Sequence, residues 1–350
     1  MKENKPTLGV IEGFYGRAWS SESRLHMAQW LPAIGIHAYL YAPKADAFLR
    51  KSWHLSWPDS QRMHLLELAN ACASNQLEFH VGLSPFELYR DYGGANKEAL
   101  KSKLGEVVDL GVSGVAILFD DMPGSLDSLA ARQAEICNDL RHWSSDADLA
   151  LRVCPTYYSD DPILDEIFGA RPGNYLEELY GELEGDFEMF WTGPQVCSDS
   201  LEPEAIRCVS DSCKGNVAIW DNYPVNDSRA RSPHIYVDPL QGRAEGLRGL
   251  IGSHWCNAMN QPALSLPALA SLPALYGVRA PERDRVLEEA GTDQQMVEAC
   301  MPLSRSPLNM ITDAERHALA LAASRETMAA SELRDWLSGG YEFDPDCLTS

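Results

Sequence analysis

Eight short apolar runs recur along the chain at nearly even spacing, and each is followed by a stretch that can form a helix. From the end of the first run at Glu12 to the end of the last at Gly252 is 240 residues across seven intervals, about 34 residues per unit. A strand-helix unit of a (β/α)8 barrel takes about 30 residues. The runs are Thr7–Glu12, Ala38–Tyr41, Glu78–Leu83, Val115–Phe119, Leu149–Val153, Phe187–Trp191, Val217–Trp220 and Gly249–Gly252. With no Gly-rich dinucleotide fingerprint present, this spacing favours a closed (β/α)8 TIM barrel over an open sheet.

The stretches between the runs have helical periodicity, as in Ser23–Ile34 and Leu126–Leu140. We therefore assign residues 1–278 to a catalytic barrel. The pattern changes after Val278, and residues 279–350 are predicted to be a short C-terminal helical appendage. Helices are expected over Pro281–Ala290 and Asp313–Leu337, and the polar tail after Gly339-Gly340 is expected to fray. A dimerisation element, and hence a homodimer, is the alternative interpretation of this appendage.

The net charge of −22 argues against nucleic acid or an anionic membrane surface as a partner, since phosphate binding needs clustered Lys and Arg. Nine cysteines are scattered without a CxxC pair, which favours reduced thiols over a disulfide framework. No secretory signal and no apolar stretch of the roughly 18 residues that a membrane span needs are visible. These features predict a cytoplasmic protein without a membrane partner.

Two adjacent carboxylates, Asp120 and Asp121, end the apolar run that begins at Gly114. A buried strand of this kind ends where water begins, so the pair is expected at the mouth of the barrel. Successive strand residues point to opposite faces, so both acids can face one cavity only if the chain turns between them. The alternative is that one Asp caps the following helix near Ser125 while the other is solvated.

Active sites of such barrels lie at the C-terminal ends of the strands. The segments expected there supply aromatic walls, amides, carboxylates and one lysine, a set that suits a sugar ring and its rim of hydroxyls. Taken singly, Trp220 could be a core residue, Lys44 a surface charge, Tyr158 a packing residue and Gly13 a turn. No HExxH motif or His cluster occurs, so neither a metal nor another cofactor is expected.

Six of these segments, in this order, carry a resemblance to a known family: GVIEGFYGR, YLYAPKAD, ILFDDM, CPTYY, WTGPQV and WDNYPVND. They resemble the motifs of glycoside hydrolase family 84, the β-N-acetylglucosaminidases, which include the enzyme that removes O-linked N-acetylglucosamine from proteins. The resemblance covers roughly Leu8 to Leu269 and excludes the tail. It implies a partner that carries N-acetylglucosamine: a glycan, a glycopeptide or a glycoprotein.

The resemblance also implies roles for individual residues. Asp120 resembles the residue that holds the 2-acetamido group of the substrate, and Asp121 resembles the general acid and base. The residues that resemble substrate-binding groups of the family are Gly13 (through its carbonyl), Lys44, Tyr158, Val196, Trp220, Asn222, Asp227 and Asn257. Among them Tyr158 is expected to support the acetamido oxygen and Trp220 to wall its pocket. The sequence departs from the family near Asn257, where Ala258 replaces the usual Pro and Leu264 stands where an acid is frequent.

Adjacent acids can hardly straddle a glycosidic bond as the two carboxylates of most retaining glycosidases do, about 5–5.5 Å apart. Substrate-assisted catalysis removes this difficulty, because the acetamido oxygen attacks the anomeric carbon and forms an oxazoline. The prediction is therefore a retaining exo-β-N-acetylglucosaminidase, in which the negative charge of Asp120 raises the pKa of Asp121.

Two other classes of protein are alternatives to this prediction. One is a non-catalytic, lectin-like barrel that binds N-acetylhexosamine. The other is a metal-dependent lyase or isomerase barrel, which would need carboxylates on three successive strand ends or a His-rich set, and neither occurs. The DxxDxDxE pattern of chitinase-type barrels is also absent. The natural aglycone and the tolerance for N-acetylgalactosamine stay open.

Overall fold

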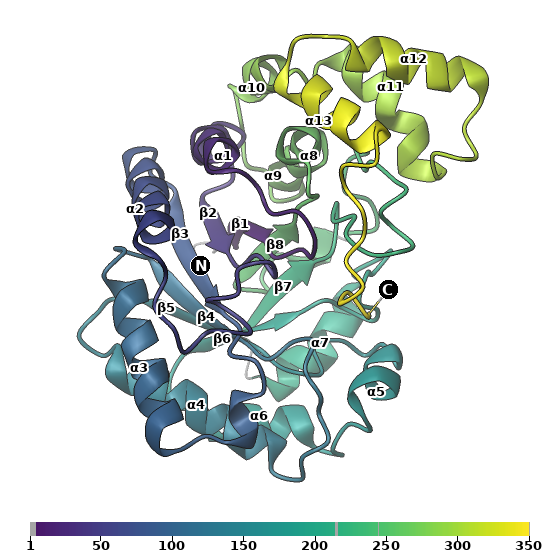
Figure 1. The fold of residues 1–350 in the computed structure, drawn as a ribbon. Helices are drawn as coiled ribbons and strands as arrows, with labels where there is room; N and C mark the ends of the chain where they lie inside the picture. Colours follow the sequence, from purple (N-terminus) through teal and green to yellow (C-terminus); the bar gives the residue numbers. More distant parts are fainter. Residues whose placement is uncertain (1–4, 214–215, 244, 350) are drawn as a thin grey trace.

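A closed barrel of eight parallel strands, in chain order and with β1 pairing β8, forms the centre of the molecule (Figure 1). The computed structural model describes residues 5–213, 216–243 and 245–349. The strands are β1 (Thr7–Glu12), β2 (Ala38–Tyr41), β3 (Glu78–Leu83), β4 (Gly114–Leu118), β5 (Ala150–Cys154), β6 (Phe187–Trp191), β7 (Val217–Asp221) and β8 (Ser253–Asn257). The predicted (β/α)8 barrel is confirmed.

The eighth strand is the one whose predicted position, Gly249–Gly252, is wrong. Gly249 has φ +87° and the Leu250 amide closes a turn onto the Leu247 carbonyl, so the chain is still turning there. β8 itself includes Ser253 and His254, which are buried because their side chains have hydrogen-bond partners. A search for apolar runs passes over a strand of this composition.

Gly9 in β1 shows how the barrel interior is filled. It lies opposite Trp255 of β8, and a Cβ atom on Gly9 would stand 2.1 Å from the indole ring. The missing side chain lets the fully buried indole occupy the space between the two strands. A large residue and a glycine thus share one layer of the barrel.

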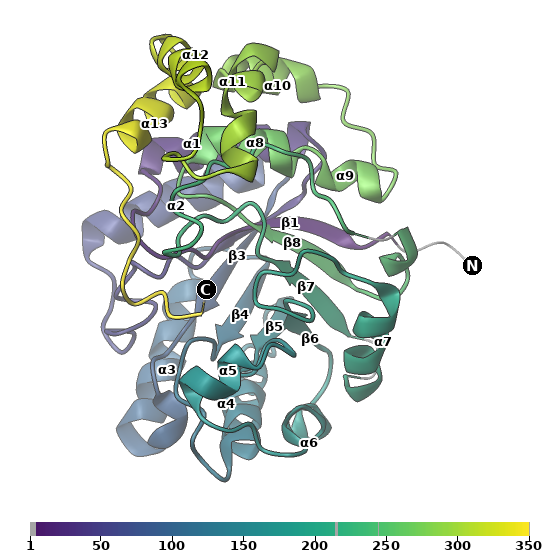
Figure 2. The same ribbon diagram turned by 90° about the vertical axis from the view of Figure 1, so that its right-hand side faces the viewer.

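Helices surround the strands, and most of them follow a strand directly (Figure 2). They are α1 (Ser21–Ala33), α2 (Asp59–Ser74), α3 (Gly94–Val108), α4 (Leu129–Trp143), α5 (Ile163–Phe168), α6 (Tyr175–Glu182), α7 (Pro203–Ser212), α8 (Pro262–Leu269) and α9 (Leu272–Leu275), with 3-10 turns η1 (Leu88–Arg90) and η2 (Glu245–Leu247). Ser20 caps α1 by accepting a hydrogen bond from the Ser23 amide. Among the described barrel helices, α1 is the one that begins with such a side-chain cap.

Four further helices gather beside α1 and α8 at one side of the barrel (Figure 1). They are α10 (Arg283–Ala290), α11 (Gln294–Arg305), α12 (Asp313–Ala323) and α13 (Met328–Leu337). The expectation of a single helix over Asp313–Leu337 is wrong. The first helix ends at Ala323, and Thr327 caps a second helix by accepting a hydrogen bond from the Ala330 amide. α11, which begins at the side-chain cap Asp293, was not expected.

Glu332 of α13 joins these helices to the barrel. Its two carboxylate oxygens accept hydrogen bonds from the Ala263 and Leu264 amides, each 3.0 Å long, in the first turn of α8. A carboxylate at a helix N-terminus satisfies amides that have no partner within the helix. Burial raises the pKa of Glu332 to about 8.

The segment that follows α13 is not frayed, and the expectation that it would be is wrong. The Gly340 amide bonds to the Asp335 carbonyl and the Gly339 amide to the Trp336 carbonyl, with Gly339 at φ +82°, which is a Schellman motif. This motif turns the chain, and residues 341–349 run back from α13 to the barrel (Figure 1, Figure 2). Thr349 is buried there.

Two properties of the whole chain complete the description. Within the described residues, no helix combines the length and apolar character that crossing a membrane requires. All nine cysteines have free thiols.

Candidate active site

A cavity at the C-terminal ends of the strands brings together all ten residues singled out from the sequence. They are Gly13, Lys44, Asp120, Asp121, Tyr158, Val196, Trp220, Asn222, Asp227 and Asn257. They come from the segments that follow six of the eight strands and from the ends of β7 and β8 themselves. The interpretations that would place Lys44 on the surface or give Asp121 a capping role therefore do not describe their surroundings.

The chain turns sharply between the two acids. Asp121 has φ +56°, a left-handed conformation that is uncommon for a residue other than glycine. This turn lets both carboxylates line the same cavity although they are adjacent in sequence. The expected turn between the two acids is confirmed.

Lys44 lies against both carboxylates. Its Nζ forms an ion pair with Asp120 Oδ2 and lies 3.5 Å from Asp121 Oδ2, and all three side chains are at most 10% exposed. Burial alone would lower the pKa of Lys44, but the two carboxylates outweigh it and raise that pKa. A protonated lysine thus balances part of the negative charge of the pair.

Asp121 is held from several sides. Its Oδ2 accepts a hydrogen bond from the Tyr15 hydroxyl at 2.9 Å and its Oδ1 accepts one from the Tyr158 hydroxyl at 3.0 Å. Arg50 Nη2 donates to the Asp121 carbonyl oxygen at 3.0 Å. Burial alone would raise the pKa of Asp121. The positive charges of Lys44 and Arg50, together with the two hydroxyl hydrogen bonds, outweigh the effect of burial, so the pKa lies below its usual value. The expectation of a raised pKa for Asp121 is therefore wrong.

Asp120 differs from its neighbour in having a free acceptor. Its Oδ1 is buried and has no hydrogen-bond partner among the described residues, while Oδ2 pairs with Lys44. An unpaired buried acceptor is costly, of the order of 1–3 kcal/mol, and is rare in native proteins unless a function requires it. Asp120 lines the cavity, so this oxygen is an acceptor left for a donor on a bound molecule.

An amide network forms one wall of the cavity. Asn222 Oδ1 accepts from Trp220 Nε1 at 2.9 Å and from Asn257 Nδ2 at 3.0 Å, and Asn222 Nδ2 donates to the Val196 carbonyl at 2.8 Å. Asn257 Oδ1 in turn accepts from the Gly13 amide at 3.2 Å. Three internal hydrogen bonds therefore hold the side chain of Asn222, which fixes the indole beside it.

Gly13 must be a glycine for the same wall to form. A Cβ atom at this position would lie 2.8 Å from Cζ2 of Trp220 and 2.7 Å from Cγ2 of Ile11. The indole itself packs edge-on against Phe190, with ring centroids 5.2 Å apart. The absence of a side chain at Gly13 thus leaves a flat aromatic surface against the cavity.

Asp227 supplies a third carboxylate on the far side of the cavity from β4. Its Oδ2 accepts a hydrogen bond from the Tyr15 amide at 2.8 Å. Burial raises the pKa of Asp227 to about 6. This group therefore changes charge within the physiological range.

Sequence reasoning missed several residues that line or support the cavity. Tyr15 and Arg50 contact Asp121, while Arg231, Cys347 and Thr349 line the cavity wall. Tyr15 lies within the quoted segment GVIEGFYGR and could have been singled out there. Arg50 and the two tail residues belong to no motif, and nothing in the sequence places them near the acids.

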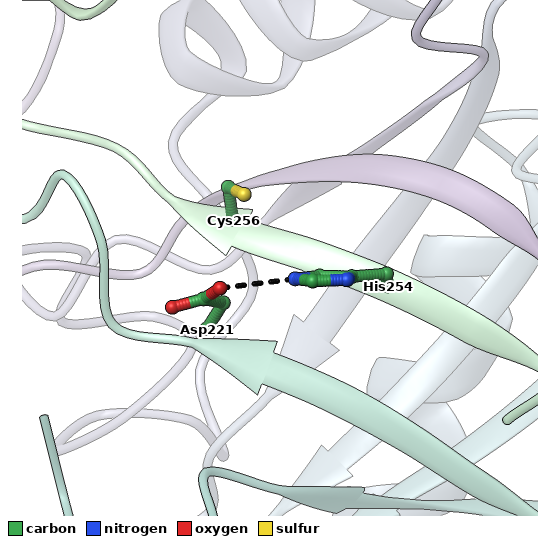
Figure 3. Close-up of side chains that lie close together, drawn as sticks. All are labelled: Asp221, His254 and Cys256. Atoms are coloured by element: carbon green, nitrogen blue, oxygen red, sulfur yellow. Dashed lines mark hydrogen bonds and ion pairs between the residues drawn. The ribbon is translucent and has the colours of Figure 1, made fainter. Parts of the chain in front are cut away.

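Asp221, His254 and Cys256 lie close together on β7 and β8 and have the residue types of a metal site (Figure 3). Both oxygens of Asp221 are already bound by Arg243, and His254 Nε2 lies 3.0 Å from Asp221 Oδ2. The other ring nitrogen of His254 bonds to the Tyr276 hydroxyl at 2.8 Å. A cation would have to displace the guanidinium, so the cluster has the character of a buried ion pair that ties β7 to β8.

Comparison with known proteins gives a consistent result. The model of a family described as beta-N-acetylglucosaminidase (NAGidase) matches residues 8–297. The Protein O-GlcNAcase of Rattus norvegicus and that of Mus musculus are each 30% identical to the chain over 247 residues, which is 68% of this chain and 26% of theirs. The chain thus spans about a quarter of the length of these relatives.

A solved structure of a mutant O-GlcNAc hydrolase from Thermobaculum terrenum is similar over most of the molecule. It matches with a TM-score of 0.77 and 25% sequence identity, and the match covers 95% of this chain and 80% of that one. The similarity therefore includes the C-terminal helices as well as the barrel.

Proposed function

The chain belongs to the β-N-acetylglucosaminidase family, the glycoside hydrolases of family 84, and from this membership we propose that it is a retaining exo-β-N-acetylglucosaminidase. It hydrolyses terminal β-linked N-acetylglucosamine by substrate-assisted catalysis through an oxazoline. No metal or other cofactor enters this proposal.

The unpaired Oδ1 of Asp120 is the observation that carries the proposal. The N–H of a 2-acetamido group supplies the donor that this atom lacks. With the N–H held, the acetamido oxygen is directed at the anomeric carbon, and the carboxylate stabilises the positive charge that develops in the transition state. A sugar with a 2-hydroxyl in place of the acetamido group supplies no internal nucleophile.

Asp121 takes the role of general acid and then general base. The leaving oxygen needs a proton in the first step, and water must lose one in the second. In this structure Lys44, Arg50 and the two tyrosine hydroxyls favour the ionised form of Asp121. Binding of the sugar redirects Lys44 to a hydroxyl and Tyr158 to the acetamido oxygen, which withdraws this stabilisation and raises the pKa of Asp121 in the complex.

The remaining residues hold the sugar ring. The Gly13 carbonyl, Lys44, Asp227 and Asn257 bind hydroxyls, while Trp220 and Val196 enclose the acetamido methyl group. Asn222 can bind a sugar hydroxyl through the second N–H of Nδ2, while its three internal hydrogen bonds hold Trp220 and Asn257 in place.

The substrate class follows from the relatives. Two of them are named Protein O-GlcNAcase, and we extend that class to this chain: a glycoprotein or glycopeptide that carries O-linked N-acetylglucosamine, with other N-acetylglucosamine glycans as further candidates. The free thiols of all nine cysteines agree with the cytoplasmic location expected from the sequence. A homodimer through the C-terminal helices stays a prediction.

A panel of nitrophenyl glycosides tests the proposal. The β-N-acetylglucosaminide should be hydrolysed and the β-glucoside should be nearly inert. Asp120→Asn, which keeps the shape but loses the charge, should lower kcat on the N-acetylglucosaminide by about a hundredfold or more. Brisk hydrolysis of the glucoside, or an unchanged rate in the variant, would refute substrate assistance.

The same panel decides the rival function. A lectin-like barrel would bind N-acetylglucosamine in calorimetry without releasing nitrophenol from any glycoside. The presence of both adjacent acids in one cavity favours the enzyme.

A further inference from the structure

Residues 341–349, here called the strap, cross the mouth of the candidate active site. They leave the Schellman motif at the end of α13 and run back to the strand ends (Figure 1, Figure 2). Cys347 and Thr349 line the same cavity as Asp120 and Asp121. The Thr349 hydroxyl lies 3.4 Å from the Tyr158 hydroxyl, which itself donates to Asp121.

The strap leaves little room for a sugar. With the strap in place the cavity measures about 50 Å³. A water molecule takes about 30 Å³ of liquid volume, and sites for small-molecule ligands usually measure about 300 Å³ or more. A cavity of this size does not admit an N-acetylglucosamine ring, and Cys347 and Thr349 of the strap are part of what closes it.

The charged contacts that hold the strap are few and exposed, while Tyr341 packs against the hydrophobic core and Thr349 is buried. Asp346 forms a 2.6 Å ion pair with Lys51, and both side chains are more than half exposed. Arg17 lies over the Tyr341 ring at 4.9 Å and Arg229 over the Phe343 ring at 4.9 Å. Exposed pairs of these kinds contribute about 0.2–1 kcal/mol each, far less than a packed helix.

Among the described residues, no backbone-to-backbone hydrogen bond joins the strap to the barrel. Within the described residues, its one backbone-to-backbone hydrogen bond, from the Cys347 amide to the Asp344 carbonyl, is internal to it. No strand or helix of the barrel pairs with it. The strap can therefore leave without breaking regular structure.

We propose that the strap is an autoinhibitory segment that occupies the mouth of the sugar site and competes with the substrate for it. This inference rests on the proposed function and adds a means of regulating it. The strap carries acidic and aromatic side chains, and it binds a set of arginine and lysine side chains at the mouth of an otherwise strongly acidic protein.

An internal competitor has a defined kinetic signature. If only a fraction of the molecules is open, the apparent dissociation constant rises by the inverse of that fraction. Saturating substrate holds the strap away, so kcat is unaffected. Weakening the strap should therefore lower KM and leave kcat unchanged.

Asp346→Asn provides the first test, because it removes one of the three acidic charges of the strap at a side chain that does not line the cavity. On nitrophenyl N-acetylglucosaminide we expect KM to fall about two- to fivefold, the loss of one exposed ion pair. Asp284→Asn is the matched control, since Asp284 forms an exposed ion pair with Arg283 on α10, away from the site, and should leave KM unchanged. Replacing residues 341–349 by Gly and Ser of the same length should lower KM tenfold or more. An unchanged or higher KM in that variant would overturn the proposal.

Alkylation of Cys347 tests the strap without any turnover. Iodoacetamide labelling, followed by mass spectrometry of peptides, reports each thiol, with exposed Cys208 as the internal reference. Burial raises the pKa of the Cys347 thiol, so a closed strap protects it. Cys347 should react faster in Asp346→Asn than in the native chain or in Asp284→Asn. Equal rates of Cys347 alkylation in all three proteins would contradict the proposed opening of the strap. This result would hold even if the chain proved not to be a glycosidase.

Discussion

Asp121 is the residue on which the chemistry of the leaving group depends. Asp121→Asn keeps the contacts with Tyr15 and Tyr158 but cannot donate a proton as an acid. We expect kcat to fall about 10²- to 10⁴-fold on alkyl or peptide glycosides, whose leaving oxygen needs protonation, and much less on a dinitrophenyl glycoside. Steady-state rates on both substrates check this, and equal losses on the two would argue against the acid role.

Asp227 makes binding of the sugar dependent on pH. Its pKa of about 6 means that it is mostly ionised at pH 7 and mostly protonated at pH 5. The carboxylate accepts hydrogen bonds from hydroxyls better than the acid does, so affinity should fall as the pH falls through 6. Calorimetry with N-acetylglucosamine should give about a tenfold larger Kd at pH 5 than at pH 7.

The same titration in Asp227→Asn is the control for this assignment. The variant has no group to protonate at this position, so its Kd should be larger than that of the native chain at both pH values and nearly independent of pH. A pH dependence that persists unchanged in the variant would assign the ionisation to another residue.

At the scale of single residues, the sequence predicted which side chains meet but not how they affect one another. Motif order and strand ends were enough to gather ten residues that line one cavity. The direction of the pKa shift of Asp121 was predicted wrongly because the sequence shows only the effect of the adjacent carboxylate, Asp120. Lys44 and Arg50 reverse that effect, and Arg50 arrives from a loop that carries no motif.

Among the elements, β1 and α1 are joined by a buried ion pair. Arg24 of α1 donates from Nε and Nη2 to the two carboxylate oxygens of Glu12, at 2.9 and 2.8 Å, and Glu12 is fully buried. Arg24→Ala leaves that buried charge without its counter-ion, although Tyr39 and Trp19 still donate hydrogen bonds to it, and should destabilise the protein by about 3–5 kcal/mol.

Chemical denaturation of Arg24→Ala and of a control variant checks this value. Arg132→Ala removes an arginine of similar charge from an exposed pair with Glu135, and it should cost less than about 1 kcal/mol. Similar losses in the two variants would mean that Glu12 finds another partner or becomes solvated.

Elements were predictable where apolar periodicity marked them and not where polar contacts did. Seven strands fall at or within one residue of their expected positions, because each is an apolar run between turns. The position of β8 was predicted wrongly because its residues Ser253 and His254 are polar. They are buried with hydrogen bonds to residues distant in sequence. The division between α12 and α13 depends on a cap at Thr327, which is a short-range signal that the apolar pattern conceals.

For the whole molecule, the barrel and the C-terminal helices share one hydrophobic cluster. Val286, Leu303 and Leu333 belong to the same buried set as the barrel residues, and Glu332 caps α8. We therefore propose that residues 279–350 are an appendage that unfolds together with residues 1–278. Calorimetry should show a single transition that coincides with loss of tryptophan fluorescence, whereas two separated transitions would indicate independent domains.

The path of the strap is the property of the whole molecule that sequence reasoning could not reach. Gly339-Gly340 indicates that a helix ends, but the direction of the chain afterwards depends on where α13 packs. The polar composition of residues 341–349 is the same for a frayed tail and for a segment held by exposed charges. Only the position of α13 against α8 decides between them.

Whether the substrate provides its own nucleophile can be measured by making that nucleophile weaker. Replacing the hydrogens of the acetyl methyl group by one, two and three fluorines withdraws electrons from the carbonyl oxygen while changing its size little. If this oxygen attacks the anomeric carbon, kcat/KM on the nitrophenyl glycosides should fall steeply and regularly with each fluorine. A rate that does not respond to fluorination would show that a protein side chain or water attacks instead, and the account of this site would be wrong.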